Sequence, residues 1–344
     1  MTMKEMILTG LRTNDEYHIG NYLGAMRPNI EMAIKHADEY DVHMFIPDLH
    51  SFTTPIDHTT FYERSLKNLK VFFAAGLPME KDNVRVYRQS HVPAHSELTI
   101  ILNNFASFGQ LSRMVEFKDK RERLKEEFVS VGLFDYPVLM TSDILLYGAK
   151  YVPLGDDQRQ HIELARDLAE KFNNKFGEVF VLPATIKEQA KFVGIDEPLR
   201  VMSLQNPDKK MSKSVSDPSG TIMIFDDPAV ARKKVMSAVT DSIGQINFDR
   251  KSQPGISNLL TMLCALSGRS MEDVKTEFVG QTQYGGLKTA VADEVEKLLT
   301  DLQSKFVVID DEKVMKKLVA DELVANEIAN KTLHSAQKAV GLRN

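Results

Sequence analysis

The sequence contains only one cysteine, Cys264, in 344 residues. A single cysteine excludes an internal disulfide and a cysteine-based metal site, which fits a reducing cytoplasm. No apolar run approaches the roughly 20 residues that a membrane span requires. Residues 1–9 lack the pattern of a signal peptide. The sequence therefore predicts a soluble, cytoplasmic protein without a metal site of its own.

An excess of positive charge is also missing. The formal net charge is -5, whereas nucleic-acid-binding proteins often carry a global basic excess. Any contact with RNA must therefore come from a local basic face, and two clusters are candidates: residues 232–234 and residues 316–317. Each cluster could equally be a solvated helix face. A Gly-x-x-x-x-Gly-Lys-Ser/Thr loop is absent as well, which excludes a P-loop NTPase.

Strand-like and helix-like segments alternate in the first half of the chain. Short apolar runs at residues 6–9, 42–46, 84–87 and 151–154 predict four strands. Helical spacing of apolar residues predicts helices that begin near Gly20 and span residues 61–75. This alternation indicates an α/β fold, a Rossmann-type doubly wound parallel sheet covered by helices on both faces. Ligands of such sheets lie beyond the carboxyl ends of the strands, where residues 12–14, 48–50 and 155–158 are polar.

The strand signal fades after Ser219. Apolar residues from Val291 to Phe306 recur at helical spacing, and glycine and proline pairs separate the helices. We therefore expect a Rossmann-type domain over residues 1–216, with a helical connecting insertion at roughly 89–146. An all-helical C-terminal domain is expected over residues 217–344.

Two motifs at opposite ends of the α/β region suggest phosphate chemistry. His18-Ile19-Gly20-Asn21 follows the first predicted strand, and a helix that starts there offers free N–H groups to a phosphate. The simpler alternative is a turn histidine with a capping asparagine. Lys210-Met211-Ser212-Lys213-Ser214 places two ammonium groups on one loop, which suits a departing pyrophosphate. A lysine pair of this kind is more often a solvated loop.

Other polar residues suggest how a substrate is held. Asp143 is an acid in an apolar segment and needs a hydrogen-bond donor, such as an indole N–H or a phenol, unless it pairs with an Arg or Lys. Asp157 could accept from ribose hydroxyls and Gln158 could hold a substrate amine. Alternatively, Asp156 and Asp157 simply favour a helix N-terminus.

Together the two motifs resemble the signatures of class I aminoacyl-tRNA synthetases. Across nearly the whole chain the sequence is similar to the bacterial-type tryptophanyl-tRNA synthetases. That resemblance implies a Rossmann-type catalytic domain and a helical anticodon-side domain. It also implies ATP with Mg²⁺, L-tryptophan and tRNA(Trp) as partners, and a homodimer.

The resemblance also implies roles for individual residues. His18, Lys210 and Lys213 correspond to the catalytic residues. The implied ATP-binding residues are Arg12, Thr13, Asn14, Gly20, Asn21, Gly155, Asp156, Asp157, Val201, Lys210, Met211, Ser212, Lys213 and Ser214. The implied tryptophan-binding residues are Asp143, Gln158, His50, Tyr136 and Met140.

The sequence departs from this family at three places. Residues 12–16 lack the usual proline, Leu8 stands where an aromatic residue often packs, and Leu49 precedes His50 where many members have glutamine. Tyrosyl-tRNA synthetase is the nearest alternative, but Met140 stands where that family usually has a glutamine. A tRNA-independent adenylate-forming nucleotidyltransferase and a non-catalytic relative are the others. The length, the lysine loop and the helical last third argue against the first of these, and the intact signature residues argue against the second.

Overall fold

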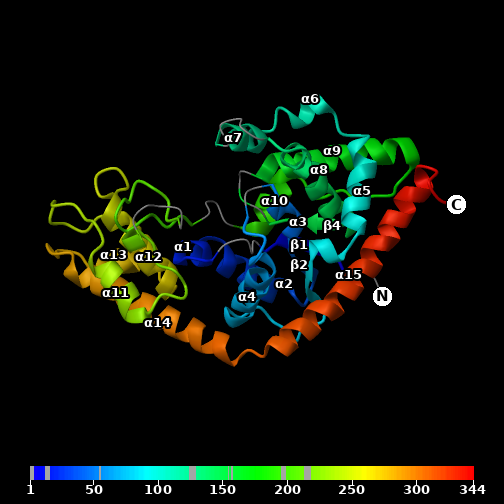
Figure 1. The fold of residues 1–344 in the computed structure, drawn as a ribbon. Coiled ribbons are helices and arrows are strands. Elements are labelled where there is room, and N and C mark those ends of the chain that lie inside the picture. The colour runs from blue at the N-terminus through cyan, green and yellow to red at the C-terminus, as the bar shows by residue number, and fades with distance from the viewer. Residues whose placement is uncertain are drawn as a thin grey trace.

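The computed structural model (Figure 1) describes residues 4–11, 16–53, 56–123, 129–153, 155, 158–194, 199–212 and 218–344. In these ranges one parallel sheet contains β1 (Met6–Gly10), β2 (Asp41–Ile46), β3 (Val84–Arg88) and β4 (Ala149–Tyr151). The strand order is β3-β2-β1-β4, and every neighbouring pair is parallel. The chain order reverses between β1 and β4, so the crevice for a ligand opens at their carboxyl ends.

Residues on each strand alternate between two buried cores, as expected when helices cover both faces. Ile7, Val42 and Met44 belong to one core, and Leu8 and Phe45 belong to the other. The first core includes residues of α2 (Arg27–His36) and α4 (Phe61–Ala74), and the second includes residues of α5 (Ala94–Asn103), α8 (Val131–Leu146) and α9 (Arg159–Phe176). The doubly wound α/β prediction is therefore confirmed, as is the helix expected over residues 61–75.

The helix expected near Gly20 is present but irregular. It begins as α1 (Ile19–Asn21), widens into a π-helical segment (Tyr22–Met26) and continues as α2. Single π-helical turns inside α-helices are frequent at functional sites.

The fourth strand begins earlier than the sequence predicts. We expected residues 151–154, whereas β4 spans Ala149–Tyr151 and Leu154 lies outside the described residues. Gly148 has a φ of +59°, which turns the chain directly from α8 into the strand. Gln189 of α10 (Ile186–Val193) then accepts from the Val152 N–H at 2.9 Å and donates to the Lys150 carbonyl at 3.0 Å. Its side chain therefore covers the outer edge of the sheet.

The segment between β3 and β4 is helical. It contains α5, α6 (Phe108–Leu111), α7 (Val115–Arg123) and α8, and a short 3-10 turn (Gln89–His91) leads into it. α5 and α8 pack together, and Thr99 donates to the Ser142 hydroxyl at 3.0 Å across their contact. This packing fixes the two helices that carry His95 and Asp143.

The last part of the chain is helical in the described residues, as expected. α11 (Pro228–Met236), α12 (Pro254–Ser267) and α13 (Met271–Glu277) form a compact group beside the sheet domain (Figure 1). α14 (Gly285–Val308) packs against α11, α12 and α4. α15 (Asp311–Ala339) then returns to the sheet domain and contacts β3, α5 and α8. No helix in the described ranges is long and apolar enough to cross a membrane.

The final helix covers the open edge of β3 with charged side chains. Asp321 accepts from the Val86 N–H at 2.7 Å, and Lys317 donates to the Val84 carbonyl at 2.8 Å. Glu322 holds the Arg88 guanidinium with both carboxylate oxygens, at 2.6 and 2.9 Å. An edge strand with its hydrogen-bonding groups occupied in this way cannot pair with another chain.

Loss of the Glu322 carboxylate should be costly, because both partners are buried, with side chains 7% and 9% exposed. We expect Glu322→Ala to lower the free energy of unfolding by about 3–5 kcal/mol, since the Arg88 charge would remain buried and unpaired. Glu327→Ala, an exposed glutamate on the same helix, should change it by less than about 0.5 kcal/mol. Urea unfolding of both variants tests this, and equal effects would contradict it.

Candidate active site

The first signature motif forms the start of a helix. The Asn21 N–H donates to His18 Nδ1, and the His18 N–H donates to Asn21 Oδ1, both at 3.2 Å. His18 and Asn21 therefore cap the helix, which was the simpler alternative that the sequence suggested. It leaves the His18 Nε2 atom for another partner, so the same histidine remains able to contact a ligand.

The His18 imidazole is neutral at physiological pH. Burial, and secondly the positive charge of Lys210, lower its pKa to about 4. Because Nδ1 accepts a hydrogen bond, we assign the ring hydrogen to Nε2. A neutral Nε2–H donor beside the start of a helix suits a phosphoryl oxygen.

Two glycines let this helix approach the segment around Val201 closely. A Cβ at Gly20 would lie 3.0 Å from His18 Nδ1 and 3.4 Å from the Val201 Cβ, and one at Gly24 would lie 2.8 Å from the Leu199 carbonyl oxygen. At Gly24 a side chain would collide with the backbone, and at Gly20 it would force the His18 ring or Val201 to shift. His18, Gly20 and Val201, which are far apart in sequence, therefore lie together.

Backbone hydrogen bonds bring the second signature to the same place. The Met211 N–H donates to the Val201 carbonyl at 3.0 Å, and the Ser203 N–H donates to the Lys209 carbonyl at 2.8 Å. On the other side, the Ile19 N–H donates to the Ile222 carbonyl at 2.9 Å. Lys210 is exposed, whereas the Met211 side chain is buried in the core. Lys210 therefore exposes its side chain near His18, whose pKa its charge lowers. The Ser212 carbonyl accepts from the Thr221 hydroxyl at 2.9 Å.

Several predicted ATP-binding residues lie outside the described residues. They are Arg12, Thr13, Asn14, Asp156, Asp157, Lys213 and Ser214. Gly155 is exposed after β4, and Gln158 is half-buried at the N-cap of α9. Both lie beyond the carboxyl end of β4, at the switch point of the sheet.

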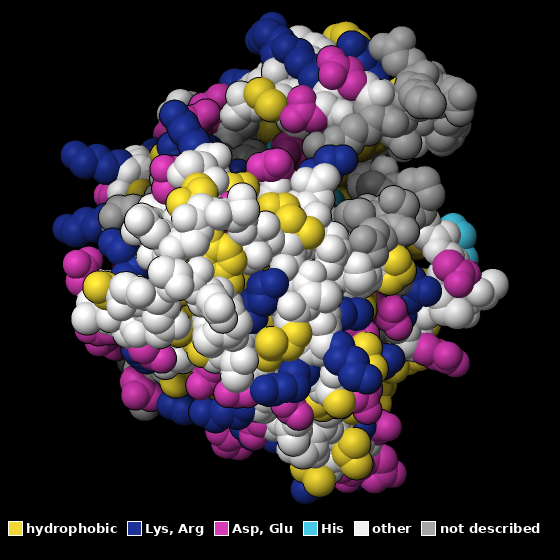
Figure 2. Space-filling view, turned by 90° about the vertical axis from the view of Figure 1, so that its left-hand side faces the viewer, with side chains coloured by type: hydrophobic (Ala, Val, Ile, Leu, Met, Phe, Trp, Pro, Cys, Tyr) yellow, Lys and Arg dark blue, Asp and Glu magenta, His cyan; other side chains and the backbone are white. Residues whose placement is uncertain are grey.

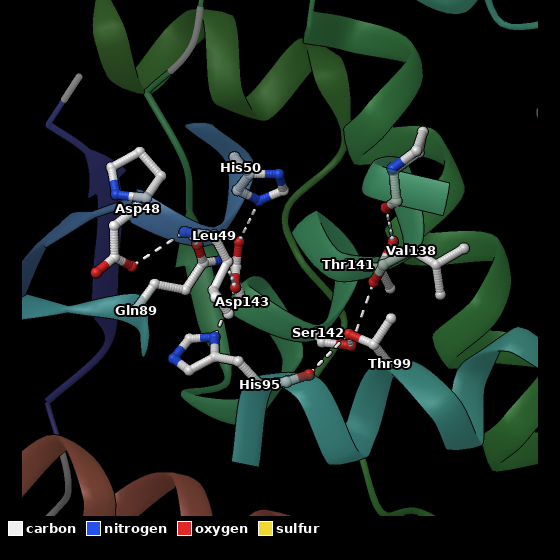
Figure 3. Close-up of polar contacts among 12 residues, drawn as sticks. Asp48, Leu49, His50, Gln89, His95, Thr99, Val138, Thr141, Ser142 and Asp143 are labelled. Atoms are coloured by element: carbon white, nitrogen blue, oxygen red, sulfur yellow. Dashed lines mark hydrogen bonds and ion pairs between the residues drawn. The ribbon is translucent and has the colours of Figure 1, made fainter. Parts of the chain in front are cut away.

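Asp143 is the centre of a buried hydrogen-bond network (Figure 3). Only 1% of the residue is exposed. Oδ1 accepts from Gln89 Nε2 at 2.7 Å and lies 2.5 Å from His95 Nδ1, while Oδ2 lies 2.9 Å from His50 Nε2. The Leu49 N–H donates to Gln89 Oε1 at 3.1 Å, which fixes the Gln89 amide with its NH₂ group toward Asp143. The partners of this acid are thus histidines and an amide, and no Arg or Lys among the described residues pairs with it.

Asp143 carries a negative charge in this network. Burial would raise its pKa, but hydrogen bonds from His50 and His95 outweigh burial and bring the pKa to about 2. Both histidine nitrogens that face it therefore carry hydrogen. A buried anionic acceptor suits a ligand that donates a hydrogen bond.

Other predicted pocket residues surround His50. The His50 and Tyr136 rings are 6.1 Å apart and nearly perpendicular, and Tyr136 Oη lies 3.0 Å from His161 Nε2. Met140 is half-buried one turn before Asp143 on α8. Leu8, by contrast, is buried in the core on the insertion side of the sheet. The structure therefore places His50, Tyr136 and Asp143 in one cluster.

Gln89 and His95 were not among the residues predicted for the site. Gln89 begins the 3-10 turn that follows β3, and His95 lies on α5 with the apolar residue Leu98 one turn later. A polar residue in such a buried helix needs a partner, and this was the available signal. The sequence did not say that the partner would be Asp143.

Next to this network, His43 of β2 is completely buried. Its two ring nitrogens have no hydrogen-bond partner among the described residues, and its ring lies 5.1 Å from that of Tyr147. Burial, followed by the charges of Arg85 and Lys317, lowers its pKa from the ordinary 6.5 to about 3.

The buried His43 should make the protein sensitive to mild acid. Between pH 6.5 and 3 the unfolded state binds a proton at His43 that the folded state rejects, so the free energy of unfolding falls as the pH falls through this window. From pH 7 to pH 5 the loss due to His43 should be about 2 kcal/mol. Urea unfolding at both pH values measures this loss. The free energy of unfolding of His43→Phe should fall by about 2 kcal/mol less than that of the wild type. The variant His334→Gln, changed at an exposed histidine, should show the full wild-type loss. An unchanged loss in His43→Phe would contradict the assignment.

The two basic clusters are largely neutralised within the protein. Arg232 pairs with Asp293 and with Glu296, the latter at 3.1 Å, and Lys234 pairs with Asp226 at 2.7 Å. Lys317 donates hydrogen bonds to the Val84 carbonyl at the edge of β3 and to Asp321. On the face that the helical group turns outward, basic and acidic side chains are interspersed (Figure 2). Charge reversal at Lys317 would therefore damage the fold and could not test a contact with RNA.

The sequence was compared with known proteins. The family described as tRNA synthetases class I (W and Y) matches residues 4–300. The tryptophan--tRNA ligase of Caldanaerobacter subterraneus subsp. tengcongensis is 42% identical over 336 residues, 98% of each chain.

Solved structures agree with this match. Tryptophanyl-tRNA synthetase of Mycoplasma pneumoniae has a TM-score of 0.80 at 32% identity and covers 99% of both chains. The Campylobacter jejuni enzyme, solved with ADP and tryptophan, has a TM-score of 0.77 at 29% identity and covers 98% of this chain and 99% of its own. With the two signature segments joined at one crevice, these matches lead to one conclusion: the chain belongs to the class I tRNA synthetases for tryptophan and tyrosine.

Proposed function

We propose that this protein is an ATP-dependent tryptophan--tRNA ligase. It joins L-tryptophan to ATP as tryptophanyl-adenylate, releases pyrophosphate, and transfers tryptophan to the 3′-terminal adenosine of tRNA(Trp). The observation that carries the proposal is the 42% identity to a tryptophan--tRNA ligase across 98% of both chains. A family match alone would leave tyrosine open, because the family includes both specificities.

ATP is expected to bind where the two signatures meet. Gly20 and Asn21 at the helix start and the His18 Nε2–H would hold phosphoryl oxygens, and Val201 would contact adenine. Lys210, together with Lys213, would stabilise the charge that builds on pyrophosphate as the α-phosphate bond breaks. The other proposed ATP contacts are Arg12, Thr13, Asn14, Gly155, Asp156, Asp157, Met211, Ser212 and Ser214.

Tryptophan is expected to bind against α8. Asp143, already anionic, would accept a hydrogen bond from the indole N–H, and Gln158 would hold the amino group. His50, Tyr136 and Met140 would line the ring. The thioether of Met140 favours an indole over a phenol, which requires more polar partners.

The remaining partners follow from the same proposal. Mg²⁺ would arrive with ATP as part of the substrate and be held by its phosphates. The helical C-terminal region, residues 217–344, would face tRNA, the enzyme would act in the cytoplasm, and a second copy of the chain would complete a homodimer.

Aminoacylation separates this proposal from a nucleotidyltransferase that forms an adenylate without tRNA. The full chain, supplied with ATP, Mg²⁺ and labelled tryptophan, should charge a tRNA(Trp) transcript and leave a tRNA(Tyr) transcript uncharged. Adenylate formation without charging of any tRNA would favour the nucleotidyltransferase. Charging of tRNA(Tyr) with tyrosine would favour the tyrosyl alternative.

A further inference from the structure

His95 links two residues that lie one turn apart on the neighbouring helix. Its Nδ1 atom lies 2.5 Å from Asp143 Oδ1, and its Nε2 atom lies 2.9 Å from Tyr147 Oη. Asp143 and Tyr147 are four residues apart at the end of α8, so they share a face. His95 is 0% exposed and Tyr147 is 5% exposed. The three side chains therefore form a row that solvent does not reach.

One arrangement of the hydrogens satisfies every polar group in this row. Because Asp143 is ionised, His95 Nδ1 must carry a hydrogen toward it. Burial raises the pKa of the Tyr147 phenol, which therefore keeps its proton. We assign the phenol as a donor to His95 Nε2, which corresponds to the Nδ1–H tautomer of the ring. Each donor thus points toward Asp143.

The two oxygens of Asp143 consequently differ. Oδ1 is occupied by His95 and Gln89, which are both completely buried. Oδ2 faces His50, whose side chain is 19% exposed and is thus the most accessible of the three partners (Figure 3). Among the described residues around Asp143, the side of Oδ2 is therefore the more accessible one for a ligand.

We infer that His95 and Tyr147 are positioning residues that fix Asp143 as an acceptor with Oδ2 turned toward the substrate, and that they thereby contribute to selectivity for an indole N–H. The inference rests on the proposed role of Asp143. His95 and Tyr147 do not touch the substrate in this account, since both act through the carboxylate.

The test compares tryptophan with 3-benzothienylalanine, an isostere that has sulfur in place of the indole N–H. The selectivity ratio is kcat/KM for tryptophan divided by kcat/KM for the isostere, both from ATP–pyrophosphate exchange. The wild-type ratio should be about 10² or more, the scale expected when a buried polar group loses its match. A purely structural defect would lower both values of kcat/KM and leave the ratio unchanged.

Three variants form a matched set. His95→Leu removes the donor to Asp143 and should lower the ratio by about tenfold or more. His95→Asn can place its amide N–H where Nδ1 lies and should keep the ratio within about threefold of wild type. Tyr147→Phe removes one hydroxyl and should lower the ratio by about three- to tenfold, because the His95 tautomer is no longer enforced.

The outcomes distinguish the positioning role of His95 and Tyr147 from the proposed role of Asp143 as the acceptor of the indole N–H. If Asp143→Asn keeps the wild-type ratio, the role of Asp143 itself is wrong. If the selectivity ratio falls in Asp143→Asn but keeps its wild-type value in His95→Leu and Tyr147→Phe, only the positioning role is wrong. Should His95→Leu fail to fold, Tyr147→Phe decides alone, and an unchanged ratio in that variant overturns the inference.

Discussion

Replacing Lys210 by alanine is expected to lower kcat for adenylate formation by about 10²–10³-fold, comparable to the removal of one oxyanion-type donor. The KM for ATP should change little, because an interaction made only in the transition state affects kcat. Backbone hydrogen bonds between residues 209–211 and 201–203 hold this lysine beside His18 and leave its side chain exposed. ATP–pyrophosphate exchange at saturating tryptophan, over a range of ATP concentrations, gives both constants.

Lys209→Ala is the matched control for this experiment. Lys209 is also exposed and directly precedes Lys210, yet it lies outside the signature motif. Its loss should leave kcat within about twofold of wild type, as expected for a side chain that makes no transition-state contact. A rise in the KM for ATP at constant kcat in Lys210→Ala would instead assign this lysine to ground-state binding.

Replacing Asp143 by alanine is expected to raise the KM for tryptophan and to lower kcat/KM by about 10²-fold or more. The substrate would lose its acceptor, and His50 and His95 would each lose a hydrogen-bond partner. Discrimination against phenylalanine should fall sharply, because phenylalanine has no N–H for the carboxylate to select. Kinetics of exchange with both amino acids measure this directly.

A second aspartate on the same helix provides the control. Asp135 is half-buried on α8 and accepts from Asn103 Nδ2 at 3.1 Å, away from the Asp143 network. Asp135→Ala should keep wild-type discrimination. If Asp143→Ala also keeps its discrimination against phenylalanine, the proposed contact with the indole N–H is refuted.

The sheet and its flanking helices were predictable because local patterns determine them. The apolar runs at β1, β2 and β3 are bounded by glycine, proline or polar residues, and α4 has a clear apolar stripe. β4 was misplaced because its start depends on the left-handed turn at Gly148 and on Gln189 at the sheet edge. Neither feature alters the local hydropathy pattern.

The site was predictable only in part. The two signatures are contiguous in sequence, so they could be recognised before their meeting at Val201 was known. The partners of Asp143 come from two segments, the stretch from the end of β3 to α5 and α3 (Asp48–Ser51), whereas Asp143 itself lies on α8. Only the packing of these segments makes them neighbours. The return of α15 to β3 was not expected for the same reason, because its charged residues have the composition of a solvated helix.

Amino-acid-dependent exchange of pyrophosphate into ATP, measured with all twenty amino acids in turn, tests the central claim most directly. The proposed site requires ATP, Mg²⁺ and a substrate that donates a ring N–H to Asp143. Exchange should therefore depend on Mg²⁺ and occur with tryptophan alone. Stronger exchange with tyrosine, or none with any amino acid, would contradict the assignment.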